Sequence, residues 1–225
     1  MSMWVRGALT GAVLVAVLAG CGDGGGGGGD GGSGPGVIGG SDGDGRAPAP
    51  VLGDARQVSE ALPSRVSLGE GWGATRSPRV RDGAETARAC QVFSGTSCSG
   101  VLAGGDTKFM RNGQAAHAAF AEFSMYAVDT PENAKVVYAA MRTATGQKTY
   151  GGVTRLSVDA GADETHAYAD DDGPHALVRV GGVVAFVETR SDGLDEAAAR
   201  DQLERLARVQ VERVRKVAAG ENPDA

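Results

Sequence analysis

The spacing of apolar residues divides the chain into a leader, an unpatterned tract and a patterned region. Residues 7–18 form a short apolar run, whereas residues 22–50 hold few apolar side chains. From Val51 onward, apolar positions recur with the periods of helices and strands. We therefore place a single domain over residues 51–219, a usual domain size, and expect a disordered tail over residues 220–225.

Three segments of the patterned region have the apolar spacing of amphipathic helices. Pro63 stops the first segment, and Gln210 interrupts the apolar stripe of the last. The middle helix has a clear start, because Thr130 is a good N-cap and Pro131 suits the first helical position. The predicted helices cover residues 51–62, 130–146 and 195–217.

Strands are predicted where short runs rich in β-branched residues lie between turn residues. Gly181-Gly182 separates two such runs and predicts a tight hairpin. The acidic run that ends at Gly173 predicts another turn. The predicted strands cover residues 154–158, 165–169, 176–180 and 183–189.

Two further segments are harder to interpret from their pattern. Residues 116–128 fit either a helix or a strand, and the cluster of Phe123, Met125 and Tyr126 favours a strand in the later half. Residues 73–106 are rich in Gly, Arg and Ser, so we expect irregular structure with a short strand near residues 91–93. The order of elements predicts an α+β fold, an antiparallel sheet with helices packed mainly on one face.

The first twenty residues have the features of an export signal. Arg6 is the only charged residue before Cys21, and the apolar run of about twelve residues is too short to span a bilayer as a helix. Residues 18–21, Leu-Ala-Gly-Cys, resemble the bacterial lipobox, in which the Cys thiol is lipidated and becomes the new N-terminus. We therefore expect residues 1–20 to be a lipoprotein signal peptide and Cys21 to anchor the chain at the extracytoplasmic face of the cell membrane. An ordinary signal peptide followed by an unrelated Cys is the alternative.

Residues 21–50 are expected to form a disordered, Gly-rich tether. About half of residues 22–50 are glycine, and so little apolar surface cannot offset the entropy of ordering the chain. A phosphate-binding loop would need a preceding strand, a following helix and usually a Lys, which the tract lacks. The tether interpretation is therefore preferred.

The remaining two cysteines, Cys90 and Cys98, are expected to form a disulfide. Thiols outside the cytoplasm normally pair, and closing so short a loop stabilises a domain by about 2–3 kcal/mol in the chain-entropy model. Seven intervening residues do not match a Cys-x-x-Cys redox site, and no His lies nearby in the sequence to complete a metal site. The formal net charge of −6, without basic clusters, argues against nucleic acid as a partner.

Candidate chemistry is sparse. The densest group of metal-ligand types surrounds His166 and His175, with Asp163, Glu164 and the acidic run 170–172, but an acidic run before Gly is usually a solvated turn and lacks the EF-hand spacing. His117 is the third histidine. No nucleophile motif is present. We expect no metal, no cofactor and no enzymatic activity.

Trp72 is the one Trp outside the signal peptide, and it follows a Gly-rich loop. An aromatic side chain at such a place either lines a ligand cleft or anchors the loop on the core. We therefore keep Trp72 as a candidate cleft residue, with the core anchor as its alternative.

The layout resembles a known family. The resemblance rests on a first helix and a loop ending in Gly71-Trp72, the helix opening at Thr130-Pro131-Glu132-Asn133-Ala134, the hairpin around Gly181-Gly182 and a closing helix. This layout is similar to the PknH-like extracellular sensor domains and related actinobacterial lipoproteins, over roughly residues 52–218. It implies a central antiparallel sheet and a ligand-binding cleft. Those sensor domains carry two disulfides, whereas this chain offers one pair of cysteines.

The functional expectation is a lipid-anchored lipoprotein whose domain binds or senses a small molecule or a cell-wall ligand. The alternative is a structural or protein-interaction module of the envelope without a small-molecule ligand. The sequence names neither ligand nor protein partner, and it leaves the oligomeric state open.

Overall fold

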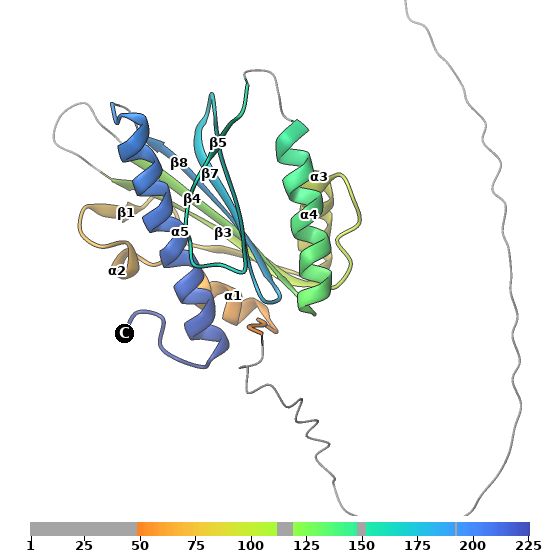
Figure 1. The fold of residues 1–225 in the computed structure, drawn as a ribbon. Helices are drawn as coiled ribbons and strands as arrows, with labels where there is room; N and C mark the ends of the chain where they lie inside the picture. The colour runs from red at the N-terminus through yellow and green to blue at the C-terminus, as the bar shows by residue number, and fades with distance from the viewer. Residues whose placement is uncertain (1–48, 112–118, 148–151, 192) are drawn as a thin grey trace, which may run out of the picture. The chain divides into compact units, whose positions relative to one another are not determined.

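The computed structural model describes residues 49–111, 119–147, 152–191 and 193–225 of the 225-residue chain. Eight strands and five helices lie within them (Figure 1). The helices are α1 (Ala55–Ala61), α2 (Arg65–Leu68), α3 (Gly83–Ser94), α4 (Pro131–Gln147) and α5 (Glu196–Ala218). The strands are β1 (Trp72–Ala74), β2 (Arg79–Asp82), β3 (Val101–Arg111), β4 (Ala119–Val128), β5 (Thr154–Leu156), β6 (Glu164–Asp170), β7 (Gly173–Val180) and β8 (Val183–Ser191). Within the same residues, no helix has the length and apolar content needed to cross a membrane.

All eight strands belong to one antiparallel sheet. Its order is β1-β3-β4-β8-β7-β6-β5, and β2 also pairs with β3. Val180 pairs with Val183, which confirms the hairpin predicted at Gly181-Gly182. The α+β class and the antiparallel sheet are confirmed, as is the strand predicted in the later half of residues 116–128, of which residues 116–118 lie outside the described part.

Helices cover both faces of the sheet, rather than mainly one face as the sequence predicts. Successive residues of β7 and β8 point to opposite faces, so Val178 and Val187 join the core under α1 and α5. Leu177 and Phe186 instead join a second core under α3 and α4. Figure 1 shows α5 and the pair α3–α4 on opposite sides of the sheet. The sequence predicts α4 but not α3, and the spacing of apolar residues does not show which face of the sheet each helix covers.

α3 occupies the segment that the sequence predicts to be irregular, and residues 91–93 form its last turn instead of a strand. Its ends are defined by local chemistry. The side chain of Asp82 accepts a hydrogen bond from the backbone N–H of Glu85, and Gly95 closes the helix in the left-handed conformation at φ 70°. These caps and the burial of Cys90 outweigh the weak strand preference of residues 91–93.

The same segment holds β1, β2 and the start of β3. The sequence does not predict these strands, because glycines within the segment suggest a loop. Gly104 lies in β3 beneath α3, and a Cβ at this position would collide with the methyl group of Thr86. Glycine is used here so that a helix can lie close to the strand, and not to break the strand.

Polar residues of α5 bind the end of α1. Arg213 donates from Nε to the carbonyl oxygen of Leu62 at 2.9 Å and from Nη2 to that of Glu60 at 2.7 Å. Gln210 donates from Nε2 to the carbonyl oxygen of Ala61 at 3.1 Å. These carbonyls lie at the helix end, where intrahelical partners are missing, so Gln210 interrupts the apolar stripe in order to cap α1.

The C-terminal tail is held against the domain, whereas the sequence predicts disorder over residues 220–225. The Asp224 carboxylate accepts hydrogen bonds from Arg213 Nη1 and from Ser64 Oγ, the latter at 2.6 Å. Burial would raise the pKa of Asp224, but its hydrogen bonds to Ser64 and Arg213 and the nearby positive charges hold the pKa below its usual value. The buried cation on α5 therefore explains why a polar tail is ordered.

Candidate functional site

A cleft opens on the sheet face that α3 and α4 cover only in part. α3 packs on β2 and β3, and α4 packs on β4, β7 and β8 towards the β7–β8 turn. The cleft has a volume of about 610 Å³ and lies at the other end of these strands. Its polar lining includes Lys108, Glu122, Asp172, His175, Glu188 and Arg190, and Phe120, whose surface is 41 % exposed, adds an aromatic wall.

Four lining side chains form one row across four neighbouring strands. His175 of β7 is paired in register with Glu188 of β8, Glu188 with Glu122 of β4, and Glu122 with Lys108 of β3. Side chains at paired positions of an antiparallel sheet lie side by side on one face. We call these four residues the cleft row. Its centre holds two carboxylates, because Glu188 and Glu122 are direct cross-strand neighbours.

Both cationic side chains of the lining are engaged in ion pairs. Lys108 Nζ pairs with Glu122 Oε2. Arg190 Nη2 lies 2.9 Å from Asp172 Oδ1, and its Nε donates to the Asp172 carbonyl oxygen at 3.2 Å. The cleft therefore carries two ion pairs on its rim, Lys108–Glu122 and Arg190–Asp172, and a histidine, His175, beside Asp170.

His175 is held rigidly at the edge of the cleft, with its side chain 5 % exposed. Its ring stacks on Tyr168 with centroids 4.9 Å apart and on Phe186 with centroids 5.7 Å apart. Nε2 lies 2.8 Å from Asp170 Oδ1 and Nδ1 lies 3.5 Å from Glu188 Oε1. Nδ1 is buried and has no hydrogen-bond partner among the described residues.

Asp170 stabilises this arrangement as an ionised carboxylate. Burial alone would raise its pKa, but hydrogen bonds from His175 and from the backbone of Asp172 and Gly173 outweigh burial and hold the pKa below its usual value. The Asp172 N–H lies 2.9 Å from Asp170 Oδ1, so the acidic run is a hydrogen-bonded turn between β6 and β7.

The histidine pair predicted from the sequence is only partly brought together. His166 and Tyr168 face the same way, as expected, with ring centroids 5.6 Å apart. Burial, and then the charges of Arg142 and Arg155, lower the pKa of His166. Burial, and then the charges of Asp170 and Glu188, raise the pKa of Tyr168. An aromatic column thus runs from His166 through Tyr168 to His175.

The other acids of that group, Asp163 and Glu164, form ion pairs with Arg179. Arg179 is buried, its Nε lies 2.6 Å from Glu164 Oε1 and its Nη1 lies 3.2 Å from Asp163 Oδ2. Arg179 Nη1 also donates to the carbonyl oxygen of Gly181 at the hairpin turn. Within the described part of the chain, no three His, Cys, Asp or Glu side chains converge as metal ligands would.

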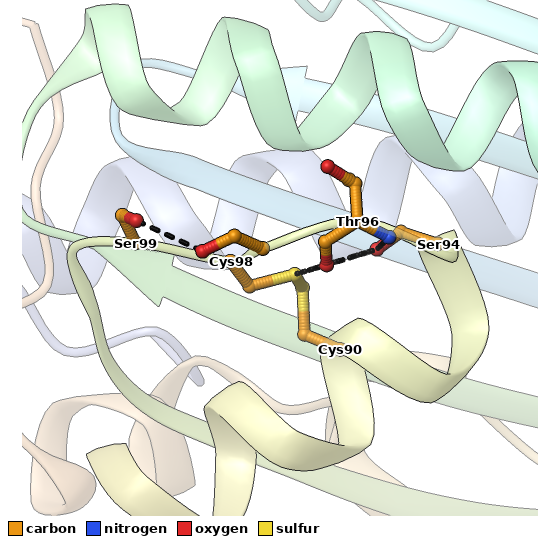
Figure 2. The surroundings of a disulfide bond; sticks show 6 residues. Cys90, Ser94, Thr96, Cys98 and Ser99 are labelled. Atoms are coloured by element: carbon orange, nitrogen blue, oxygen red, sulfur yellow. Dashed lines mark hydrogen bonds between the residues drawn. A yellow bond between two sulfur atoms is a disulfide. The ribbon is translucent and has the colours of Figure 1, made fainter. Parts of the chain in front are cut away.

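Cys90 and Cys98 form a disulfide, as the sequence predicts. Figure 2 shows that the bond joins α3 to the loop that follows it, next to Ser94 and Thr96. Cys90 is fully buried and belongs to the core under α3 and α4. The bond therefore fastens the covering helix and is not part of the cleft.

The remaining candidate residues lie elsewhere. Trp72 is 2 % exposed and belongs to the core under α1 and α5, so it has the environment of a core anchor and is not in the lining of the cleft. Cys21 and His117 lie outside the described residues.

Sequence reasoning did not single out Lys108, Glu122 or Glu188 as site residues. One available signal was the position of Glu122 and Glu188 within predicted strands, where an inward-facing charge is costly unless it is paired or solvated. The strand alternation does place Glu122 on the same face as Phe120 and Tyr126. The pattern does not show that β4 pairs with β8, because residues 129–182 separate these strands in the sequence.

The fold and the cleft together define an α+β domain built on one antiparallel sheet with helices on both faces and an open cleft beside one helix pair. Among solved structures, this chain is similar to the extracellular domain of PknH from Mycobacterium tuberculosis, with a TM-score of 0.51 and 13 % sequence identity. The match covers 74 % of this chain and 98 % of that domain. The resemblance in fold predicted from the sequence is confirmed. No protein-family model and no curated protein sequence matches the chain.

Proposed function

We propose that the domain is an extracellular sensing module and that the cleft holds its ligand. The observation that carries this proposal is the cleft itself. Its volume of about 610 Å³ lies within the roughly 300–1,000 Å³ usual for small-molecule sites. Its lining combines an exposed aromatic surface with a few polar groups, as such sites do. The similarity in fold to the extracellular domain of PknH is consistent with this role.

Cys21 is proposed to be lipidated, which would hold the domain on the outer face of the membrane through the Gly-rich tether. The tether would reach the domain at Pro50, whose carbonyl accepts a hydrogen bond from Gly182 at the β7–β8 turn. Glu188 lies five residues further along β8, roughly 17 Å away at about 3.4 Å per residue. The cleft is thus at the other end of the strand, which favours a ligand from the cell wall or from solution. We propose no catalytic step.

A thermal-shift screen of the purified chain in detergent tests the sensing role. Soluble cell-wall fragments, lipids, metals and small organic ions are added at increasing concentration, because a ligand of the folded state raises the melting temperature in a dose-dependent way. Replacing Phe120 with Ala should weaken the shift by removing an exposed wall of the cleft. Replacing Val92 with Ala is the control, because Val92 is exposed on α3 and lies outside the cleft lining.

The result against sensing is a melting temperature unchanged by every compound, together with a protein cross-linked at the membrane. That outcome would favour the alternative, a structural or interaction module of the envelope. The anchor is tested separately by cell fractionation. Cys21→Ala should move the chain out of the membrane fraction, whereas Ser33→Ala in the tether should leave it there. Membrane retention of Cys21→Ala would contradict lipidation at this residue.

A further inference from the structure

A second pocket lies beside α3, on the sheet face that carries the cleft row. The strand register places Arg79 of β2 opposite Asp106 of β3, and Asp106 opposite Ser124 of β4. Asp106 and Lys108 are alternate residues of β3, so these side chains share the face of the cleft row. The pocket has a volume of about 300 Å³, and Lys108 and Glu122 line both it and the cleft. We call it the arginine pocket, because its lining of four cationic side chains and two carboxylates is positive on a chain of formal net charge −6.

Both carboxylates of the arginine pocket already have cationic partners. Asp106 is buried, its Oδ1 lies 3.0 Å from Arg81 Nη1 and its Oδ2 pairs with Arg76 Nη2. Glu122 Oε2 pairs with Lys108 Nζ, and Glu122 Oε1 lies 3.8 Å from Arg76 Nη2. A cationic ligand would therefore have to displace a side chain from each carboxylate that it approached.

Donor groups of the same pocket are left without a partner. Arg76 Nε is buried and has no hydrogen-bond acceptor among the described residues. Arg79 also lines the pocket, and its guanidinium forms no ion pair within the described part of the chain. The hydroxyls of Ser124 and Tyr126 line the pocket from β4 and likewise form no hydrogen bond to a described residue. Burial raises the pKa of Tyr126, so its hydroxyl keeps the proton that it can donate.

The unpartnered donors define the chemistry of a ligand. They come from three parts of the chain: the segment before β2, β2 itself and β4. A ligand for them needs a negative charge and acceptor oxygens that point in several directions. A phosphoryl group has up to three such oxygens and about two negative charges, whereas a carboxylate has two oxygens in one plane. Guanidinium groups also match the geometry of phosphate oxygens.

We infer that the arginine pocket binds a phosphoryl group, whose oxygens accept hydrogen bonds from the Arg79 guanidinium, from Arg76 Nε and from the hydroxyls of Ser124 and Tyr126. The Arg76 side chain is 30 % exposed, and Nε is covered in the free protein, so this side chain turns towards the bound group. The site is additional to the ligand of the cleft and does not depend on the proposed sensing role.

The test compares inorganic phosphate with acetate. Each anion is titrated at pH 8 into the ¹⁵N-labelled full chain in a non-ionic detergent, with sodium chloride added to keep the ionic strength constant, because salt screens exposed charges. The backbone amide signals are followed by NMR. We expect phosphate to move the signals of Arg79, Ser124 and Tyr126 in a saturable way, with at least tenfold higher affinity than acetate.

The matched variants are Arg79→Gln and Arg88→Gln. The first removes the unpaired guanidinium of the pocket and should lower the affinity for phosphate at least tenfold. The second removes the same charge from an exposed position on α3 outside the lining and should leave the affinity unchanged. Tyr126→Phe is a second pocket variant that keeps every charge, and it should lower the affinity about threefold. Equal thermal unfolding of the variants shows that folding is intact.

Two further probes distinguish the sources of a phosphoryl group. Glycerol 1-phosphate represents a soluble or cell-wall phosphate, and detergent micelles doped with phosphatidylglycerol represent a lipid headgroup. Movement of the Arg79, Ser124 and Tyr126 signals by the first probe identifies a ligand from solution or the wall. Movement by the doped micelles alone identifies a lipid. Either result supports the phosphoryl site.

Three results would overturn the inference. The first is acetate binding as tightly as phosphate, which would show that the pocket attracts any anion. The second is an affinity for phosphate that is unchanged in Arg79→Gln, or lowered equally in Arg88→Gln. The third is silence of the pocket signals with every phosphate probe. Phe120→Ala, which changes the lining of the cleft and not of the arginine pocket, should leave phosphate binding unchanged, so the two sites are tested separately.

Discussion

Replacing Arg213 with Met should destabilise the domain more than any comparable change on the surface of α5. The Arg213 side chain is 4 % exposed and connects three parts of the chain: α5, the end of α1 and the C-terminal tail. It donates to the carbonyl oxygens of Glu60, Leu62 and Pro223 and pairs with Asp224. Met retains the apolar stem of the side chain and removes every one of these donors.

The magnitude follows from the groups left behind. The carbonyl oxygens of Leu62, which is buried, and of Glu60, whose bond is partly buried, lose their donor, and an acceptor buried without a partner costs roughly 1–3 kcal/mol. The Asp224 side chain is 36 % exposed, so water solvates much of its charge and its ion pair adds little. We therefore expect a loss of about 3 kcal/mol in the free energy of unfolding. For a domain of this size, that loss lowers the melting temperature by roughly 6–12 °C.

Differential scanning calorimetry of the variant and of Arg205→Met measures the effect. Arg205 is an exposed residue of the same helix, so its replacement keeps the change of side chain and should alter stability by no more than about 0.5 kcal/mol. A melting temperature for Arg213→Met within 2 °C of that for Arg205→Met, a margin of roughly 1 kcal/mol, would refute the capping role.

Three further outcomes follow from the structure. The Cys90→Ala/Cys98→Ala double variant should lose about 2.5 kcal/mol, the value for so short a closed loop, and an unchanged urea midpoint would contradict this. Because the pKa of Asp170 is lowered in the folded state, its carboxylate adds stability above about pH 4, and this stability is lost as the pH falls through the folded-state pKa. The urea midpoint of Asp170→Asn should therefore change less across that acid range than the midpoint of the wild type. Parallel pH profiles of the two proteins would count against this role of Asp170. Gly181→Ala should lower the free energy of unfolding by at least about 1 kcal/mol, because φ is 57° and the new Cβ would collide with the backbone of Pro50. Gly220→Ala is the control, because its φ is 74° but the space around it is open, so it should cost less in the same urea assay. Equal losses in the two variants would show that the collision is relieved.

The sequence predicted α4, α5 and the β7–β8 hairpin, because each is defined by residues within or next to it, such as an N-cap or a turn glycine. α4 begins after Thr130, whose Oγ1 accepts from the N–H of Asn133 at 3.2 Å, and α5 begins after Asp195, which accepts from the N–H of Ala198. The β7–β8 hairpin follows from two glycines between apolar runs. All three were predicted to within a few residues, because the interactions that define them lie within one turn of the chain.

Local signals failed where an element depends on a partner far along the chain. β3 contains two adjacent glycines, which suggest a loop until Gly104 is seen beneath Thr86 of α3. The tail offers little apolar surface, and its Asp224 is held by the buried Arg213 of α5. Neither partner can be read from the spacing of residues, because both contacts are set by the way the helices pack on the sheet.

The cleft depends on the same kind of long-range pairing between strands. Its lining residues could therefore not be predicted from the sequence, whereas the acidic turn of residues 170–172 could. Arg213 and His175 are both buried polar side chains, but they differ in what surrounds them. The guanidinium of Arg213 meets backbone oxygens and a carboxylate that accept its protons, which is sufficient to explain its presence. His175 meets Asp170 with one nitrogen and faces another acceptor with the other, at the edge of a cleft. A polar group whose hydrogen bonds are all made within the fold is explained by the fold. The buried Nδ1 of His175 has no hydrogen bond among the described residues, so the edge of the cleft is a place that the fold alone does not explain.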